Sequence, residues 1–389
     1  MSDAQTLREP PLWGVLALLW LAGIYLRLPI LVIPPLTPAL TQDLPLSQTL
    51  MGSLTTLPVL MLSFGALLAA LAISRLGARN TLVLALGLVL LTSAARALSN
   101  TPSSLLVWSA LMGLGIALMQ PALPALLPGW LNPKRLALGT AVYMNGMLLG
   151  EFLGAGLTLP LLMPLTGEDW RLTLVLWSLP GLLLLPFFFL PKLKAEPPSA
   201  SPVHWFPDLT NPLVWQLGLL LAASASLFFG TNAYLASLLE SRGEAHLLQA
   251  GYFWFNLAQV ASSLLMLLMA RRWVGQRGPL WLSTIGCLIG MAGLLLTQGW
   301  LSLVFAFSLS FWAGVLLILV VALPPQLLPG KEAGRLAAGA FMLAYSLSFL
   351  LPLLGGLVAD WSGQPQWALI TLLILATPAL WICRQFKSV

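Results

Sequence analysis

LLPGWLNPKRLALGTA, residues 126–141, and LLPGKEAGRLAAGAF, residues 327–341, are two versions of one sequence within a single chain of 389 residues. Each contains a Leu-Leu-Pro-Gly turn followed by an Arg-Leu-Ala-x-Gly element. A bias toward leucine and alanine alone does not reproduce this punctuation. The repeat therefore predicts that the chain is a duplication of one unit.

The sequence on both sides of these stretches repeats as well. Each stretch follows an apolar segment with a pair of prolines and precedes one with a glycine cluster: Pro121 and Pro124 with Gly154 and Gly156, then Pro324 and Pro325 with Gly355 and Gly356. Another correspondence joins the turn at 75–79 to the turn at 273–277. Duplicated halves of a membrane carrier place the substrate site near the midplane between them.

Composition predicts a membrane protein. Hydrophobic residues make up 59% of the chain and charged residues only 8%, with a mean hydropathy of +0.92. A soluble domain has about 25% charged residues. The two cysteines, Cys287 and Cys383, have no disulfide or metal-site spacing. The chain has no Gly-x-x-x-x-Gly-Lys element, so we expect no direct coupling to ATP. We also expect no cofactor and no metal.

Twelve apolar segments are long enough to span a bilayer, which takes about 20 residues per helix. They predict an all-α membrane protein with two pseudo-symmetric six-helix bundles: residues 1–190, a Pro/Ser-rich linker at 191–212, and residues 213–389. The predicted spans are 12–36, 48–73, 80–98, 103–128, 136–163, 170–190, 213–238, 247–270, 279–298, 300–328, 335–359 and 366–384.

The distribution of Lys and Arg predicts the orientation, because cytoplasmic loops are enriched in these residues. With twelve spans, most of the 18 basic residues fall on one side, and the other side receives only Arg96, Arg171 and Arg242. We therefore expect both termini and the linker in the cytoplasm. The chain is predicted to be a monomer in a bacterial inner membrane that contacts the lipid bilayer and no nucleic acid.

The turn Arg75-Leu-Gly77-Ala-Arg79 after the second span resembles the conserved loop motif of the major facilitator superfamily. Ser74 stands where that motif has an acidic residue, and Ala78 replaces one of its basic residues. The duplicated twelve-span organisation, which covers nearly the whole chain, is also similar to this superfamily. The resemblance implies transport of a small molecule by alternating access and no enzymatic activity.

Within that superfamily, the sequence is similar to the branch of cyanate and nitroimidazole transporters. Leu26-Arg27-Leu28-Pro29 resembles the Met-Arg-Pro element of the branch, and residues 113–121, GLGIALMQP, are similar too. The resemblance implies a small substrate, either a cyanate-like anion or a nitroaromatic compound.

Once the charged residues at the ends of the spans are assigned to the loops, Arg27 and Glu151 are the ionisable residues left in the apolar interior. A charge at the centre of a membrane helix costs about 2.5–3.5 kcal/mol on insertion scales, and such residues usually mark a transport pathway. Arg27 follows residue 12, its predicted span start, by as many residues as Glu151 follows residue 136. At 1.5 Å per residue, both lie about 22 Å deep, so contact between them is possible.

Arg27 is the candidate anion-binding residue, because its planar guanidinium matches small oxyanions and carboxylates. Pro29 and Pro34-Pro35 predict a broken first helix around it. Glu151 is the candidate proton-coupling residue, a counter-ion whose protonation frees Arg27. The alternative interpretation is a buried ion pair that fixes helix packing and never touches the substrate.

Neutral polar residues complete the predicted site. A stripe on one face of span eight, Gln249, Tyr252, Asn256, Gln259 and Ser263, predicts either a cavity wall opposite Arg27 or hydrogen bonds between packed helices. Single residues in other spans are further substrate-binding candidates, each with packing as its alternative: Gln120, Tyr143, Asn145, Asn232, Trp312 and Tyr345. Glycines spaced by four, at 146, 150 and 154, predict close helix approach.

These features favour a secondary carrier for a small anion, either cyanate-like or a carboxylate. Its two bundles would rock around a substrate site at the midplane of the membrane. The alternative is proton-coupled efflux of nitroaromatic or other neutral or weakly basic drugs. An intramembrane enzyme is disfavoured, because His204 and His246 fall in loops on opposite sides and the spans contain no acid pair. The sequence does not exclude a sensor that has the transporter fold and no transport activity.

Overall fold

The computed structural model describes residues 12–190 and 209–386, and these residues form helices joined by short turns. Most of the predicted linker at 191–212 lies outside the described residues. So do Arg8, Lys192, Lys194 and Lys387, on which part of the predicted orientation depends.

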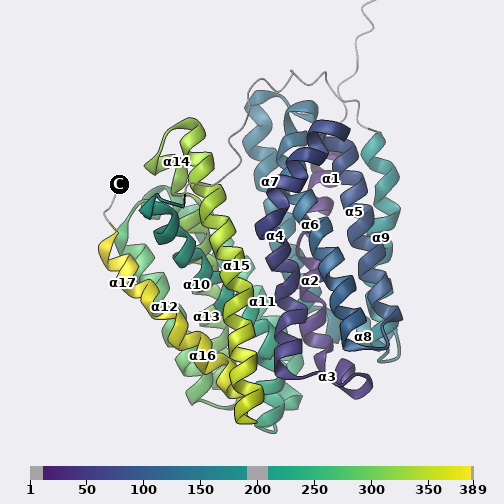
Figure 1. Ribbon diagram of the computed structural model, residues 1–389, viewed down its shortest axis with the longest axis vertical. Coiled ribbons are helices and arrows are strands. Elements are labelled where there is room, and N and C mark those ends of the chain that lie inside the picture. The colour runs from purple at the N-terminus through teal and green to yellow at the C-terminus, as the bar shows by residue number, and fades with distance from the viewer. Residues whose placement is uncertain (1–11, 191–208, 387–389) are drawn as a thin grey trace, which may run out of the picture.

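The helices form two groups (Figure 1). The first bundle consists of α1 (Leu12–Ile24), α2 (Leu28–Leu31), α3 (Ile33–Asp43), α4 (Gln48–Leu76), α5 (Ala78–Ala95), η1 (Arg96–Leu98), α6 (Pro102–Trp130), η2 (Pro133–Arg135), α7 (Leu136–Glu151), η3 (Phe152–Gly156), η4 (Thr158–Leu162), α8 (Met163–Leu165), α9 (Trp170–Leu184) and η5 (Leu185–Phe189). The second bundle consists of α10 (Pro212–Ser241), η6 (Ala245–Leu247), α11 (Leu248–Trp273), α12 (Arg277–Leu296), α13 (Gly299–Val321), α14 (Pro324–Leu327), α15 (Gly330–Ser362), α16 (Gln366–Ala376) and α17 (Pro378–Gln385).

The number of membrane spans agrees with the prediction. Among the described residues, 11 helical segments are long and apolar enough to cross a membrane. The twelfth is α4, whose parts Gln48–Gly65 and Leu68–Leu76 meet at an angle of 61°. Each bundle thus contributes six spans, and the predicted all-α fold is confirmed.

The internal repeat falls at equivalent junctions of the two bundles. The stretch at 126–141 joins α6 to α7, and the stretch at 327–341 joins α14 to α15, so each connects the fourth and fifth spans of its bundle. Gly77, between α4 and α5, has φ 79°, and Gly275, between α11 and α12, has φ 84°. Both turns therefore need the left-handed backbone region that glycine adopts at low cost.

The first span is longer and more irregular than the predicted 12–36, because it continues to Asp43. The helix ends there because Leu44 precedes Pro45 and is extended, with φ −129° and ψ 136°. The predicted break is present. Residues 25–27 form a turn between α1 and α2, as expected from Pro29, which has no N–H with which to continue the helix.

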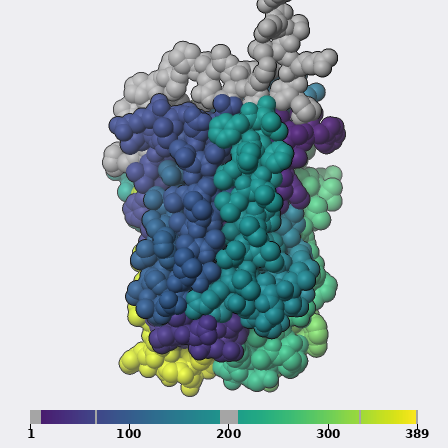
Figure 2. All heavy atoms as spheres, turned by 90° about the vertical axis from the view of Figure 1, so that its right-hand side faces the viewer, coloured from purple at the N-terminus to yellow at the C-terminus, as the bar shows by residue number. Residues whose placement is uncertain are grey.

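The end of the molecule at Asp43 is here called the far end, and the end at Leu12 the near end. The two bundles contact each other through α4 and α15 and through η3 and α11. Figure 1 shows α3 at the far end, away from the first residues of α1. Figure 2 looks onto the first bundle from outside, where α9 in teal packs beside α5 in blue.

Candidate functional site

A cavity of about 40 Å³ lies between the two bundles. The first bundle contributes Arg27, Glu151 and one methionine, and the second bundle contributes the rest of a largely apolar lining. The lining residues are Arg27, Met147, Glu151, Leu221, Ser224, Ala225, Phe228, Phe229, Gln259, Ala313, Leu317, Phe341, Ala344 and Tyr345.

Arg27 lies at the break between α1 and α2. Its backbone is not helical, with φ −132° and ψ −34°, and its N–H donates to the Ile24 carbonyl at 3.2 Å in a tightened turn. The guanidinium Nε lies 3.4 Å from Glu151 Oε1, and the two side chains are only 7% and 6% exposed. The sequence predicted equal depths for these residues, and the structure places them in direct contact.

Glycines bring α1 and α7 close enough for this ion pair. A Cβ at Gly146 would overlap the Trp20 carbonyl oxygen, and one at Gly150 would overlap that of Ile24. A Cβ at Gly154 would stand 2.7 Å from the Leu28 carbonyl oxygen. The close approach predicted from the spacing of these glycines is therefore confirmed, and the partner is the first span.

Glu151 is the last residue of α7, and a π-helical segment, η3, follows it. Pro160 contributes to this irregularity, because it has no N–H to donate to the carbonyl of Gly156. The wider turns place Phe152 against Phe253 of the second bundle, with ring centroids 5.2 Å apart. Single π-turns within α-helices are frequent at functional sites.

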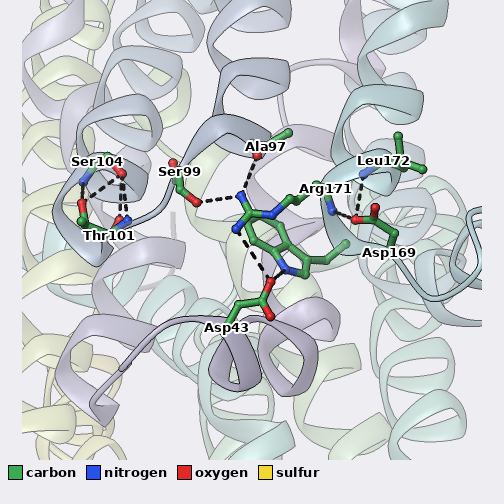
Figure 3. A network of polar contacts seen from close by, with 9 residues as sticks. Asp43, Ala97, Ser99, Thr101, Ser104, Asp169, Arg171 and Leu172 are labelled. Carbon is green, nitrogen blue, oxygen red and sulfur yellow. Dashed lines mark hydrogen bonds and ion pairs between the residues drawn. The ribbon is translucent and has the colours of Figure 1, made fainter.

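The far end of the first span is fixed within its own bundle (Figure 3). Asp43 accepts a hydrogen bond from Trp170 Nε1 at 2.9 Å and lies 3.7 Å from Arg171 Nη2. Arg171 Nη1 also donates to the carbonyl oxygens of Ala97 and Ser99, each at 2.7 Å. These bonds tie α3 to the ends of the third and sixth spans, so the outer part of the first span is held on one side of the cavity.

Tyr345 is one of two hydroxyl-bearing residues of the second bundle that line the cavity, together with Ser224. Gln120 Nε2, from the first bundle, donates to its oxygen at 3.2 Å. Among the described residues, no acceptor is found for the Tyr345 hydroxyl proton, so this O–H can donate to a group inside the cavity. Arg27 and Tyr345 therefore present donors from opposite bundles.

Two further polar residues of the lining already donate hydrogen bonds to other protein groups. Gln259 Nε2 donates to the Ser310 carbonyl at 3.0 Å, and Ser224 Oγ donates to the Ala313 carbonyl at 2.8 Å. Both bonds hold the second-bundle helices to α13. Arg27 Nη1 donates to the Leu26 carbonyl at 3.2 Å, and its Nε faces Glu151. The donors that the described contacts leave available to a substrate are thus the remaining guanidinium N–H groups of Arg27 and the hydroxyl of Tyr345.

The other predicted site residues do not line the cavity. Tyr252 and Asn256 are fully buried and bind backbone carbonyls, with Asn256 Nδ2 also donating to Asn232 Oδ1 at 3.0 Å. Asn145 is exposed and accepts from Trp20 Nε1 at 3.0 Å. The remaining two, Tyr143 and Trp312, pack near glycines of neighbouring helices, at Gly23 and Gly286.

Sequence reasoning missed the aromatic part of the lining. Phe228 and Phe229 on α10 and Phe341 on α15 face the cavity. Phe228 and Phe229 are in edge contact, with centroids 5.2 Å apart, and Phe341 stacks on Tyr345 at 5.6 Å. In a span rich in phenylalanine and leucine, no sequence signal separates residues that face a cavity from those that pack on other helices.

The sequence matches the Major Facilitator Superfamily over residues 15–351. The Uncharacterized transporter YycB of Bacillus subtilis (strain 168) is 26% identical over 292 residues, which cover 73% of this chain and 70% of the relative. The Cyanate transport protein CynX of Escherichia coli (strain K12) is 27% identical over 369 residues, which cover 93% and 94%.

Solved structures share the fold at low sequence identity. An inward-facing, occupied bacterial homologue of the human lysosomal transporter Spinster superposes with a TM-score of 0.78 at 15% identity, covering 96% of this chain and 97% of that one. The inward-open xylose transporter XylE from E. coli gives 0.76 at 15% identity, covering 97% and 96%. Because the family match extends over most of the chain, this multi-pass membrane protein belongs to the major facilitator superfamily and is an alternating-access secondary carrier.

Proposed function

We propose that this carrier moves a small anion, cyanate-like or a short carboxylate, across a bacterial inner membrane. The observation that carries the proposal is Arg27, a permanently charged guanidinium in a small cavity between the two bundles. The name of the E. coli relative, a cyanate transport protein, supports the same substrate class.

The size of the cavity favours a small solute. Sites for drug-sized ligands are about 300–1,000 Å³, whereas this cavity has a volume of about 40 Å³. A cavity of this size suits a molecule of a few heavy atoms. Its apolar walls strengthen electrostatic interactions inside it, because the local dielectric constant is low. A small anion held between Arg27 and the hydroxyl of Tyr345 fits both conditions.

The proposed division of the chain is residues 1–190, a linker at 191–212, and residues 213–389, with both termini cytoplasmic. In this orientation the far end faces the outside. Hydrogen bonds between the bundles extend from mid-span to the far end, such as Tyr252 Oη to the Pro34 carbonyl at 3.0 Å and Asp360 Oδ1 accepting from Gln48 N at 2.7 Å. They support a state closed to the outside, as in the inward-facing solved relatives.

Glu151 is the proposed coupling group. While ionised, it neutralises Arg27 at 3.4 Å and competes with an incoming anion. A proton on Glu151 removes that competition, so the anion and the proton move together. In this scheme the aromatic side chains close around the pair and exclude water.

Proteoliposome uptake of labelled cyanate tests the anion site. We expect Arg27→Ala to reduce uptake to the background of empty liposomes, and Arg27→Lys to retain part of it because lysine lacks the planar fork. Asn145→Ala is the matched control, because Asn145 is exposed and outside the cavity, and it should transport like the parent. Arg27→Ala uptake at the parent rate would disprove the anion-site assignment.

The same liposomes test coupling. Acidifying the side from which cyanate enters should raise uptake by the parent protein. Glu151→Gln imitates the protonated carboxyl, so its uptake should no longer depend on pH. An unchanged pH response in this variant removes Glu151 from the mechanism.

The second candidate function is proton-coupled efflux of nitroaromatic or other neutral or weakly basic compounds. Phe228, Phe229 and Phe341 favour it, since aromatic side chains stack on aromatic solutes. Adding nitroaromatic compounds to the uptake assay discriminates the two functions. A compound that is itself carried, with no inhibition by cyanate, supports efflux.

A further inference from the structure

Arg96 is a buried cation that the proposed mechanism does not use. The sequence predicts it on the outer side of the membrane, at the end of the third span, and the structure shows that its side chain is fully buried there. The short helix η1 turns the chain so that the guanidinium points into the first bundle. The described residues place no carboxylate in ion-pair contact with it.

The guanidinium of Arg96 binds the outer part of the broken first span. Nη2 donates to the Pro29 carbonyl at 2.9 Å and to Ser93 Oγ at 2.7 Å. Nε donates to the Ser93 carbonyl at 3.4 Å, and Nη1 has no hydrogen-bond partner within residues 12–190 and 209–386. Pro29 follows Arg27 by two residues, so the Arg96 charge lies beside the segment that carries the anion site.

A neutral donor would be enough to satisfy one carbonyl oxygen. Arg96 lies near the far end of its span, Ala78–Leu98, but it is fully buried, and burying a charge costs more than burying a neutral amide. The retained positive charge therefore needs a further reason. Arg27 and Glu151 cancel each other, so the additional cation leaves this region of the first bundle with a net positive charge.

We propose that Arg96 is a second cation of the anion site, which never touches the anion but raises its affinity through its electric field. This inference rests on the proposed anion transport. Two residues of chain span at most about 7 Å, so Arg96 lies on the order of 10 Å from the Arg27 site. At an effective dielectric constant of about 20, a unit charge at that distance changes anion binding on the order of tenfold. A neutral molecule of the same size gains nothing from it.

Ser93→Asp provides a test that leaves Arg96 in place. An aspartate at this position pairs with the guanidinium, cancels its charge, and keeps its bond to Pro29. We expect the KM for cyanate uptake to rise about tenfold with little change in the maximal rate. Ser93→Asn, of equal size and no charge, is the matched control and should keep the parent KM.

Two substitutions of Arg96 separate charge from hydrogen bonding. Arg96→Lys keeps the charge and should stay close to the parent KM, whereas Arg96→Gln keeps a donor for Pro29 and should raise KM about tenfold. If Arg96→Gln does not fold, the comparison of Ser93→Asp with Ser93→Asn still tests whether the charge of Arg96 raises the affinity for the anion. Equal KM values for the two Ser93 variants would overturn the role of Arg96.

The parent protein distinguishes this failure from failure of the proposed function. A parent that neither binds nor carries cyanate or acetate refutes anion transport, and the role of Arg96 falls with it. A parent that carries cyanate, with Ser93→Asp identical to Ser93→Asn, refutes only the role of Arg96. Melting temperatures of all variants show whether a change in KM follows a loss of folding, which would also contradict an electrostatic role.

Discussion

Asp360 joins the two bundles at the far end, and its replacement by asparagine tests how strongly that contact holds the far end closed. Its carboxylate, on α15, accepts hydrogen bonds from Gln48 N at 2.7 Å, from Thr49 N at 2.9 Å and from Thr49 Oγ at 2.5 Å. It therefore caps the N-terminus of α4 in the other bundle, where the helix dipole also favours a negative charge.

The size of the effect follows from the value of a helix cap. Removing an N-cap costs about 0.5–2 kcal/mol. Asp360 is exposed, so screening by water and salt reduces the electrostatic part. Asparagine also keeps one acceptor. We therefore take a loss of about 1 kcal/mol, which changes the ratio of closed to open far ends about fivefold.

Double electron–electron resonance measures distances between spin labels at the far end, and the distance distribution gives the ratio of closed to open far ends. Leu165→Cys in the first bundle and Leu296→Cys in the second provide sites that are 71% and 85% exposed. The native cysteines, Cys287 and Cys383, are buried. We expect Asp360→Asn to increase the population with long distances, and high salt to reduce the difference between variant and parent.

Asp169→Asn is the matched control, because Asp169 caps α9 within the first bundle by accepting from the backbone N–H of Arg171 at 2.7 Å. It should lower the melting temperature without changing the far-end distances. An unchanged distance distribution in Asp360→Asn, or an equal change in both variants, would refute the reasoning.

Two other substitutions probe the contacts of the first span. Tyr252→Phe removes the hydroxyl that donates to the Pro34 carbonyl. The helix itself cannot supply another donor to this carbonyl, because Pro38, four residues later, has no backbone N–H. We expect the closed state to lose about 1 kcal/mol of stability and the far end to open. Tyr25→Phe removes a bond within one bundle and should leave the distances unchanged. Gly150→Ala forces α1 from α7 and should lower stability by about 1–3 kcal/mol and weaken cyanate binding, measured by thermal melting and KM. Gly334→Ala, which meets nothing within 4 Å, should do neither.

The ion pair shows how far sequence reasoning reaches. Hydropathy and helical rise placed Arg27 and Glu151 at one depth, and the glycines before and after Glu151 predicted a close helix contact. Both are local patterns. That the contact is made by the first span, with Gly146 and Gly150 against backbone carbonyls of α1, depends on which helices are neighbours in the bundle.

The polar stripe of span eight shows the limit of sequence reasoning. Tyr252 and Gln259 share one helical face, yet Gln259 lines the cavity while Tyr252 is fully buried against carbonyls of both bundles. Hydrogen bonds join the bundles at Pro34 and Gln48, whereas the cavity separates them at Gln259, so residues two turns apart on one face meet different surroundings. Periodicity gives the face of a helix and not what lies opposite each turn of it.

By itself, the sequence determined that this protein has two related six-span bundles, a broken first helix and two charges at mid-membrane. Apolar length, proline positions and basic turns are properties of the chain that act locally or against the lipid. Only the tertiary structure decided that Gln120 supports Tyr345 across the bundles and that Arg96 lies inside beside Pro29. These contacts join residues far apart in the chain, and the direction of each side chain is set by the packing of helices around it.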